Sequence, residues 1–288
     1  MDNLYNLTKF SRTKKKERGK GRYKTKSPKV RTKTKSKSPG RTKTKSAKTR
    51  TKTKSSKTIQ EKLLIHSSSN PLFNNLISTQ IKEPLEEKSL ESSIKSTGKI
   101  TNKISKKVRD QYEENPYPRW KYCFKYLPIN FIDDLNYAIK PNRIKSKNKF
   151  TNPNILIAGC GTGNHTAYAS KYRNAKIVGI DLSLKSLAYA KRKSKELGLE
   201  NVEFIHSDIL NLKNLNKKFD VIESIGTLHH MKEPEKGLKI LVDILKPHGF
   251  LKLGLYSEKA RDYVIKTRKI IKEKNFKNSI EDIRKCRE

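Results

Sequence analysis

The second half of the chain alternates short apolar runs with segments whose apolar residues recur at helical spacing. Runs of four to seven residues, rich in Ile, Val, Leu and Phe, predict strands at 155–158, 175–181, 201–206, 219–224 and 250–256. The segments between them predict helices at 164–173, 183–197, 234–246 and 259–273. Strands that alternate with helices in this way indicate an α/β fold with a doubly wound parallel sheet.

A segment of unusual composition precedes this core. Ile104, Val108 and Tyr112 recur at every fourth position, which predicts a helix that Asn115-Pro116 ends. Residues 111–120 are rich in aromatics and proline and contain the only tryptophan. They are interpreted either as a lid over a pocket or as an aromatic staple that packs the helix onto the domain.

The N-terminal part of the chain differs from the rest in charge. Residues 12–57 hold 22 Lys and Arg against one acid, Glu17, in a chain of net charge +39, and Arg-Thr-Lys-Thr-Lys-Ser occurs there three times. With almost no apolar residue to bury, such a segment is predicted to be disordered. The chain therefore divides into three parts: a disordered polybasic tail at 1–57, a low-order linker at 58–103 and a domain at 104–288. Within the domain, an N-terminal helical lid at 104–150 precedes a core at 151–288.

The excess of positive charge favours a polyanionic partner. Residues 12–57 offer charge with few aromatics, so we expect non-specific nucleic-acid contact that depends on salt. A solvating tail and an anionic-lipid contact stay open as alternatives. Three cysteines without paired spacing, no apolar leader at the start and no run of about 18 apolar residues indicate a soluble, intracellular protein, cytoplasmic or nuclear. Nothing in the sequence indicates the oligomeric state.

The candidate chemistry follows the predicted strands. Gly159, Gly161 and Gly163 come directly after the first strand, where glycines let the backbone turn tightly and approach a ligand. Asp181 ends the second strand and Asp208 follows the third, and ligands of such sheets bind beyond these ends. The two acids suit a ribose and an adenine amino group. The third glycine comes one position too early for the dinucleotide fingerprint, which favours a sulfonium nucleoside with an amino-acid tail.

The motifs together resemble a known family. Ile-Leu-Ile-Ala-Gly-Cys-Gly-Thr-Gly, Gly-Ile-Asp-Leu-Ser, Ser-Asp-Ile-Leu and Phe-Asp-Val-Ile-Glu-Ser with Leu-His-His resemble the successive motifs of class I S-adenosylmethionine-dependent methyltransferases, over about 104–288. More narrowly, Gln-Tyr-Glu-Glu-Asn-Pro-Tyr-Pro-Arg-Trp resembles methyltransferase domains often fused to tetratricopeptide repeats, although no such repeat occurs here. The resemblance implies a Rossmann-like fold and S-adenosylmethionine as cofactor.

The resemblance also implies roles for individual residues. The three glycines would face the methionine part of the cofactor, Asp181 the ribose and Asp208 the adenine, and the cofactor set is completed by Leu182, Ile209 and Ser224. One position departs from the pattern, because Ile157 stands where many members carry an acid two residues before the first glycine. The cofactor's amino group must then find another partner, such as a backbone carbonyl.

The acceptor stays open. Methyl transfer from a sulfonium needs a positioned acceptor, and a general base only if that acceptor is protonated. His229 and His230 are the candidate bases, with packing or a loop hydrogen bond as the alternative reading. Two other function classes remain: a catalytically weak cofactor-fold module tethered to nucleic acid by the tail, and a nucleotide-dependent oxidoreductase.

The number of strands adds an expectation about activity. Class I sheets usually have seven strands, whereas the pattern here gives five and then charged helical segments. We therefore expect the last two strands to be missing, with 250–256 left as an apolar sheet edge. The hypothesis that follows is a nearly complete cofactor pocket beside an incomplete acceptor side, with weak turnover.

Overall fold

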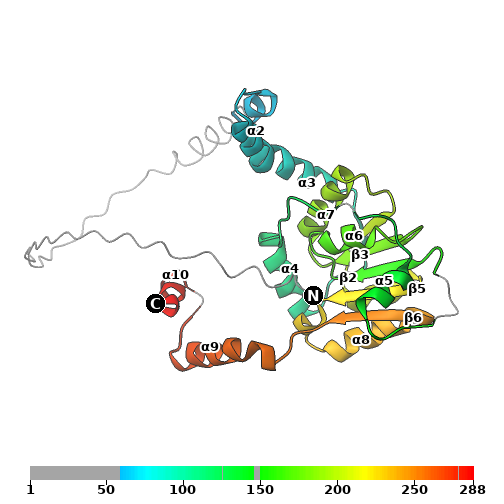
Figure 1. Ribbon diagram of the computed structural model, residues 1–288. Helices are drawn as coiled ribbons and strands as arrows, with labels where there is room; N and C mark the ends of the chain where they lie inside the picture. Colours follow the sequence, from blue (N-terminus) through cyan, green and yellow to red (C-terminus); the bar gives the residue numbers. More distant parts are fainter. Residues whose placement is uncertain (1–58, 125, 146–149, 278) are drawn as a thin grey trace, which may run out of the picture. The chain divides into compact units, whose positions relative to one another are not determined.

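A computed structural model describes residues 59–124, 126–145, 150–277 and 279–288 (Figure 1). The chain divides into two units, 1–55 and 56–288. The predictions made for the tail at 1–57 lie outside the described residues, and so does the boundary between tail and linker.

A six-stranded, wholly parallel sheet forms the centre of the second unit. Its strand order is β1-β4-β3-β2-β5-β6. The strands are β1 (Lys95–Thr97), β2 (Asn154–Ala158), β3 (Lys176–Asp181), β4 (Val202–Ser207), β5 (Phe219–Ile225) and β6 (Leu245–Gly254). From β2 the chain builds the sheet outward on one side through β3 and β4, and then returns to β2's other side with β5. The predicted doubly wound α/β fold is confirmed, and its order reverses between β2 and β5.

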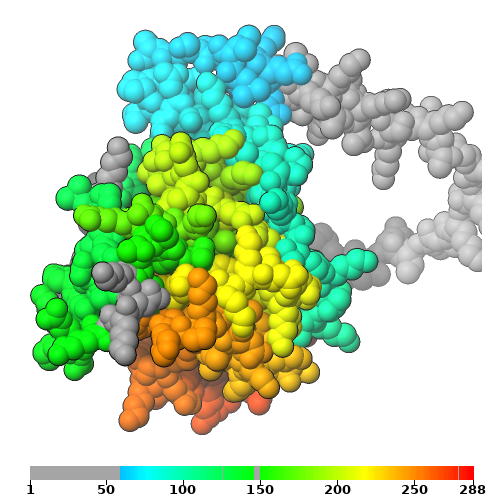
Figure 2. All heavy atoms as spheres, turned by 90° about the vertical axis from the view of Figure 1, so that its right-hand side faces the viewer, coloured from blue at the N-terminus to red at the C-terminus, as the bar shows by residue number. Residues whose placement is uncertain are grey.

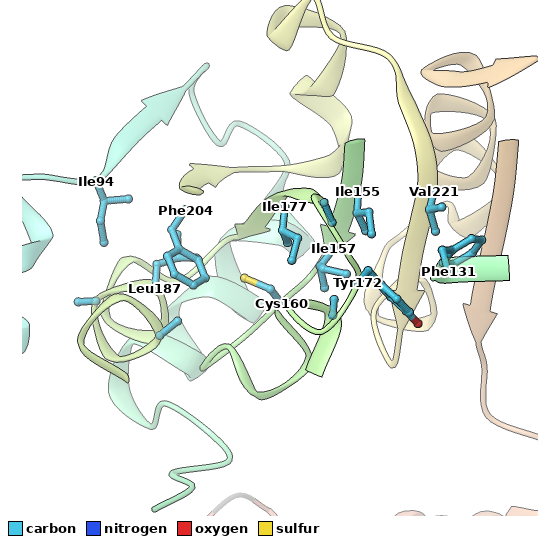
Figure 3. Packing of buried hydrophobic residues seen from close by; sticks show 14 of the residues in the cluster. Ile94, Phe131, Ile155, Ile157, Cys160, Tyr172, Ile177, Leu187, Phe204 and Val221 are labelled. Carbon is cyan, nitrogen blue, oxygen red and sulfur yellow. The ribbon is translucent and has the colours of Figure 1, made fainter. Parts of the chain in front are cut away.

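Helices cover both faces of the sheet. One face packs against α5 (Phe131–Ala138), α6 (Asn164–Ala169) and α7 (Leu184–Glu196), and the other against the 3₁₀ helix η2 (Ile209–Leu215) and α8 (Pro234–Asp243). Because side chains alternate along a strand, neighbours in sequence enter different layers. In Figure 3, Ile155, Ile157 and Val221 lie in the first layer together with Tyr172 and Phe131. This two-sided burial explains why the strands read as unbroken apolar runs.

Local signals fix the ends of the helices. The Asn102 side chain accepts hydrogen bonds from the first turn of α4 (Lys103–Glu114), and Ser183 does the same for α7. Gly198, with φ of +67°, ends α7 as the sequence predicted. The sequence of 127–140 predicts one further helix, and the helix that forms there, α5, is shorter.

The segment expected as a low-order linker at 58–103 has more structure than its sequence indicated. It contains α2 (Pro71–Ile77), the π-helix η1 (Ser78–Lys82), α3 (Glu83–Glu91) and β1. Arg192 of α7, only 1% exposed, binds Glu83 and Glu87 of α3, and β1 pairs with β4 along Lys95–Thr97. Figure 2 shows residues after α3 lying along the surface of β4 and η2. Long-range ion pairs and strand pairing therefore order a segment that has little apolar pattern.

The far edge of the sheet also differs from the expected boundaries. The final strand, predicted at 250–256, is β6 and begins at Leu245, which pairs with Phe219 before a register shift brings Phe250 opposite Val221. The helix predicted at 234–246 accordingly ends at Asp243, as α8.

Beyond β6 the described residues hold η4 (Lys259–Arg261), α9 (Asp262–Glu273) and α10 (Ile280–Arg287) and no further strand, so β6 is an edge of the described sheet. Every helix in the described part of the chain is too short or too polar to cross a bilayer.

Candidate cofactor site

The loop from β2 to α6 contains three glycines, and the backbone conformation and the space around each of them explain why they are there. All three have positive φ, at +78° for Gly159, +52° for Gly161 and +84° for Gly163. A Cβ at Gly159 would lie 2.2 Å from the Thr227 hydroxyl oxygen, and one at Gly163 would lie 2.6 Å from Cβ of Ala190. A Cβ at Gly161 would meet nothing nearer than a carbonyl at 3.7 Å. Gly159 and Gly163 therefore permit close packing, whereas Gly161 is not crowded by its neighbours.

Asp181 ties this loop to the end of β3. One carboxylate oxygen accepts a hydrogen bond from Gly161 N and the other from Ser183 N, both at 2.9 Å. Burial raises the pKa of Asp181, and the two N–H donors oppose that rise. The carboxylate thus holds Gly161 in place and retains lone pairs for further donors.

The predicted adenine side has a second role in the fold. Asp208 is buried, and its side chain caps η2 by accepting from Leu210 N at 3.0 Å. Ile209, the first residue of η2, is buried in the core, whereas Leu182 is half-buried. The Leu182 carbonyl lies 2.9 Å from Nε2 of His206. Asp208 and Leu182 therefore lie at neighbouring strand ends, as the nucleoside hypothesis requires.

The aromatic segment before the core is fastened to the glycine loop. Trp120 Nε1 donates to the Thr162 carbonyl at 2.9 Å, and the Thr162 hydroxyl donates to the Pro118 carbonyl. The Tyr189 hydroxyl of α7 donates to the Trp120 carbonyl. Of the two interpretations of 111–120, these contacts support the staple, whereas a lid function stays a prediction. Tyr117 is the residue best placed for it, since its carbonyl is the atom closest to a Cβ at Gly161.

The two histidines after β5 lie in an aromatic stack. The His229 ring lies 3.9 Å from that of Tyr256 and 4.3 Å from that of His230, measured between centroids. Arg261 covers Tyr256 at 3.9 Å. Both ring nitrogens of His229 are buried without a hydrogen-bond partner among the described residues. Burial, His230 and Arg261 lower the pKa of His229, so its ring is neutral at pH 7.

This electrostatic arrangement yields a first testable prediction. The His229 ring should titrate below the usual 6.5, because Arg261 and burial disfavour its charged form. NMR titration of its ring protons measures the midpoint, and Arg261→Gln should raise it. Lys259→Gln removes an equal charge from the same helix, η4, and serves as the control. A midpoint at or above 6.5 in the unaltered protein would contradict the arrangement.

Ser224, named for the cofactor set, lies inside the sheet. Its hydroxyl is fully buried in β5 and has no hydrogen-bond partner among the described residues. Sequence reasoning missed the site's supporting residues, among them Thr227, His206, Tyr112 and Tyr256. Tyr112 of α4 has a pKa raised by burial and next by Asp181, and Glu113 of the same helix accepts a hydrogen bond from Leu184 N, so α4 lies beside the segment that follows β3. The regular spacing of 104, 108 and 112 indicated a helix there but not which residue that helix meets.

Comparison with known proteins bears on this geometry. Residues 149–285 match a family model described as a methyltransferase domain. The matched residues make up just under half of the chain, and the match spans the glycine loop and both strand-end acids, Asp181 and Asp208.

Individual relatives share only part of the chain. An uncharacterized protein of Synechococcus is 36% identical over 111 residues, covering 38% of this chain and 27% of that protein. The ubiquinone biosynthesis O-methyltransferase of Colwellia psychrerythraea is 27% identical over 140 residues, covering 48% and 56%. A solved S-adenosylmethionine-dependent methyltransferase of Clostridium acetobutylicum is 30% identical, with a TM-score of 0.31 over 34% of this chain and 40% of that one. The chain thus spans from about a quarter to just over half of these proteins.

Proposed function

We propose that this protein transfers a methyl group from S-adenosylmethionine to an acceptor, using the site at the carboxyl ends of β2 to β5. The observation that carries the proposal is the loop held by Asp181. Its carboxylate fixes Gly161 N at 2.9 Å and so shapes the open side of the glycine turn before any ligand arrives. Such preorganisation lowers the cost of ordering a site on binding.

The residues present suit this cofactor. Gly161 leaves room that a side chain would fill, and Asp181 offers an acceptor for ribose hydroxyls. When bound, S-adenosylmethionine would supply a methyl group on a sulfonium, from which a neutral thioether is a good leaving group. The chain's own task is then to orient the acceptor and exclude water. His229, neutral and without a polar partner among the described residues, can take a proton from an acceptor that carries one.

The acceptor class stays open within this proposal. The aromatic stack of His229 and Tyr256, with Arg261 beside it, would form the acceptor side together with Tyr112. A relationship to domains that accompany tetratricopeptide repeats rests on the segment 111–120 and is proposed on that resemblance alone. Robust methyl transfer at this acceptor side would overturn the expectation, drawn from the number of strands, that turnover is weak.

Calorimetric titration tests the proposed function directly. S-adenosylmethionine and S-adenosylhomocysteine should bind with measurable heat, while NAD should not, because the third glycine, Gly163, comes one position too early for the dinucleotide fingerprint. Binding of NAD in preference to S-adenosylmethionine would favour the oxidoreductase class. Absence of binding by all three ligands would leave the cofactor-fold module tethered by its tail.

We also propose that residues 12–57 bind nucleic acid without sequence preference. Their support is charge alone, 22 basic residues against one acid. Deleting 1–57 should reduce the slope of log affinity against log salt by several units, since each neutralised phosphate contributes about 0.9. Fluorescence anisotropy with a labelled duplex over a salt series measures the slope. A slope that survives deletion assigns the binding to the domain, and cofactor affinity provides the control that the domain is intact.

A further inference from the structure

The buried acid Glu223 lies directly across from Ile157, which stands where many members of the family carry an acid. Ile157 of β2 pairs in register with Glu223 of β5, two residues before Gly159. Residues paired in neighbouring parallel strands point to the same face of a sheet. That face is the layer of Ile155, Ile157 and Val221, which α6 covers (Figure 3). Glu223 therefore holds its carboxylate at the level of Ile157, on the same face of the sheet, and α6, which follows the glycine loop, lies over that face.

The contacts of Glu223 keep this carboxylate charged. Its side chain is 1% exposed and forms an ion pair with His165 Nε2, two residues after Gly163. Lys252 of β6 lies 3.5 Å from the same oxygen. Burial alone would raise the pKa of Glu223, and His165 and Lys252 together hold it below its usual value. A buried acid that stays ionised beside a ligand loop provides a fixed negative charge.

The expected cofactor carries the complementary group. Its amino-acid tail bears an ammonium, which needs an anionic or carbonyl partner next to the glycine loop. We propose that Glu223 supplies this partner from β5, in place of an acid at position 157, and that His165 is the positioning residue that directs the carboxylate. The inference rests on the proposed function. Within the same site, the contact between Glu223 and the ammonium would make the protein prefer ligands that carry the amino-acid tail.

Three adenosyl ligands separate this contact from the rest of the pocket. S-adenosylhomocysteine has the complete tail, its deaminated analogue lacks the ammonium, and 5′-methylthioadenosine lacks the amino-acid end. The unaltered protein should bind S-adenosylhomocysteine about tenfold or more tightly than the deaminated analogue, as a charge-assisted contact implies. Glu223→Gln should remove this preference while leaving the affinity for 5′-methylthioadenosine unchanged.

Two further variants make the test specific. Glu203→Gln removes an ion-paired glutamate from β4, where it binds Lys95 and Lys217, and should keep the full preference. His165→Asn, at a partly exposed position, should reduce the preference without changing 5′-methylthioadenosine affinity, and it serves if Glu223→Gln fails to fold. An equal loss for all three ligands in either site variant would show a structural role only and overturn the inference.

The remaining outcomes also decide whether Glu223 binds the ammonium. Equal affinity of the unaltered protein for S-adenosylhomocysteine and the deaminated analogue would overturn the inference, and so would a preference that survives His165→Asn and Glu223→Gln. If the unaltered protein binds none of the three adenosyl ligands, the proposed function itself fails, which is a different result from a lost preference.

Discussion

Replacing Gly159 with alanine should destabilise the domain by about 3 kcal/mol or more, a value that combines overpacking with a strained left-handed backbone. The new Cβ would meet three atoms of one side chain, the hydroxyl oxygen, methyl and Cβ of Thr227, at 2.2, 2.5 and 2.8 Å. The φ of +78° adds strain for any residue with a Cβ. Urea unfolding followed by circular dichroism measures the change as a lowered midpoint.

A neighbouring glycine and a double mutant isolate the steric part. Gly161→Ala imposes similar backbone strain at φ of +52°, but its Cβ makes only an ordinary contact, 3.7 Å from the Tyr117 carbonyl, so it should cost only about 1 kcal/mol. Thr227→Gly removes all three clashing atoms, and combined with Gly159→Ala it should recover more stability than the two single changes predict. Additive effects in this cycle would show that Gly159 and Thr227 do not press on each other.

The core could be predicted from the sequence because its signals are local. Each buried strand is a continuous apolar run, since both of its faces are covered, and Gly198 marks the end of α7 by its own backbone requirement. The glycine loop and Asp181 fall at strand ends, so their proximity follows from the parallel topology alone. Their hydrogen bond, from Gly161 N to the carboxylate, makes that proximity specific.

Other features depend on partners far away in the chain. The strand Lys95–Thr97 is polar and short, and it becomes a strand only because β4 offers an open edge. The helix α3 is positioned by ion pairs from Arg192, a residue that reads as an exposed cation in the sequence. The same limit applies to Glu223, because its position opposite Ile157 is a property of register between strands more than 60 residues apart.

The second large effect is expected for Asp181→Ala in cofactor binding. The affinity for S-adenosylmethionine should fall by about 1.5 to 3 kcal/mol, or roughly ten- to 150-fold, because charge-assisted hydrogen bonds to the ribose are lost. The structure adds a second cause, since Gly161 N and Ser183 N lose their acceptor and the loop is no longer held in shape. Calorimetric titration at constant pH measures the loss.

The matched control for Asp181 lies at the opposite end of the sheet. Asp220 also accepts a backbone hydrogen bond, from Asn154 N at 2.9 Å, and also has a second partner, Lys246. Asp220→Ala should therefore cost comparable folding stability and leave cofactor affinity unchanged, because the amino ends of the strands are remote from the site. Equal affinities for the two variants would mean that Asp181 acts only in folding, and the ribose assignment would then be wrong. A loss confined to Asp181→Ala would instead assign the carboxylate to the cofactor site, through its contact with the ligand together with its hold on the glycine loop, since Asp220 contributes only to folding.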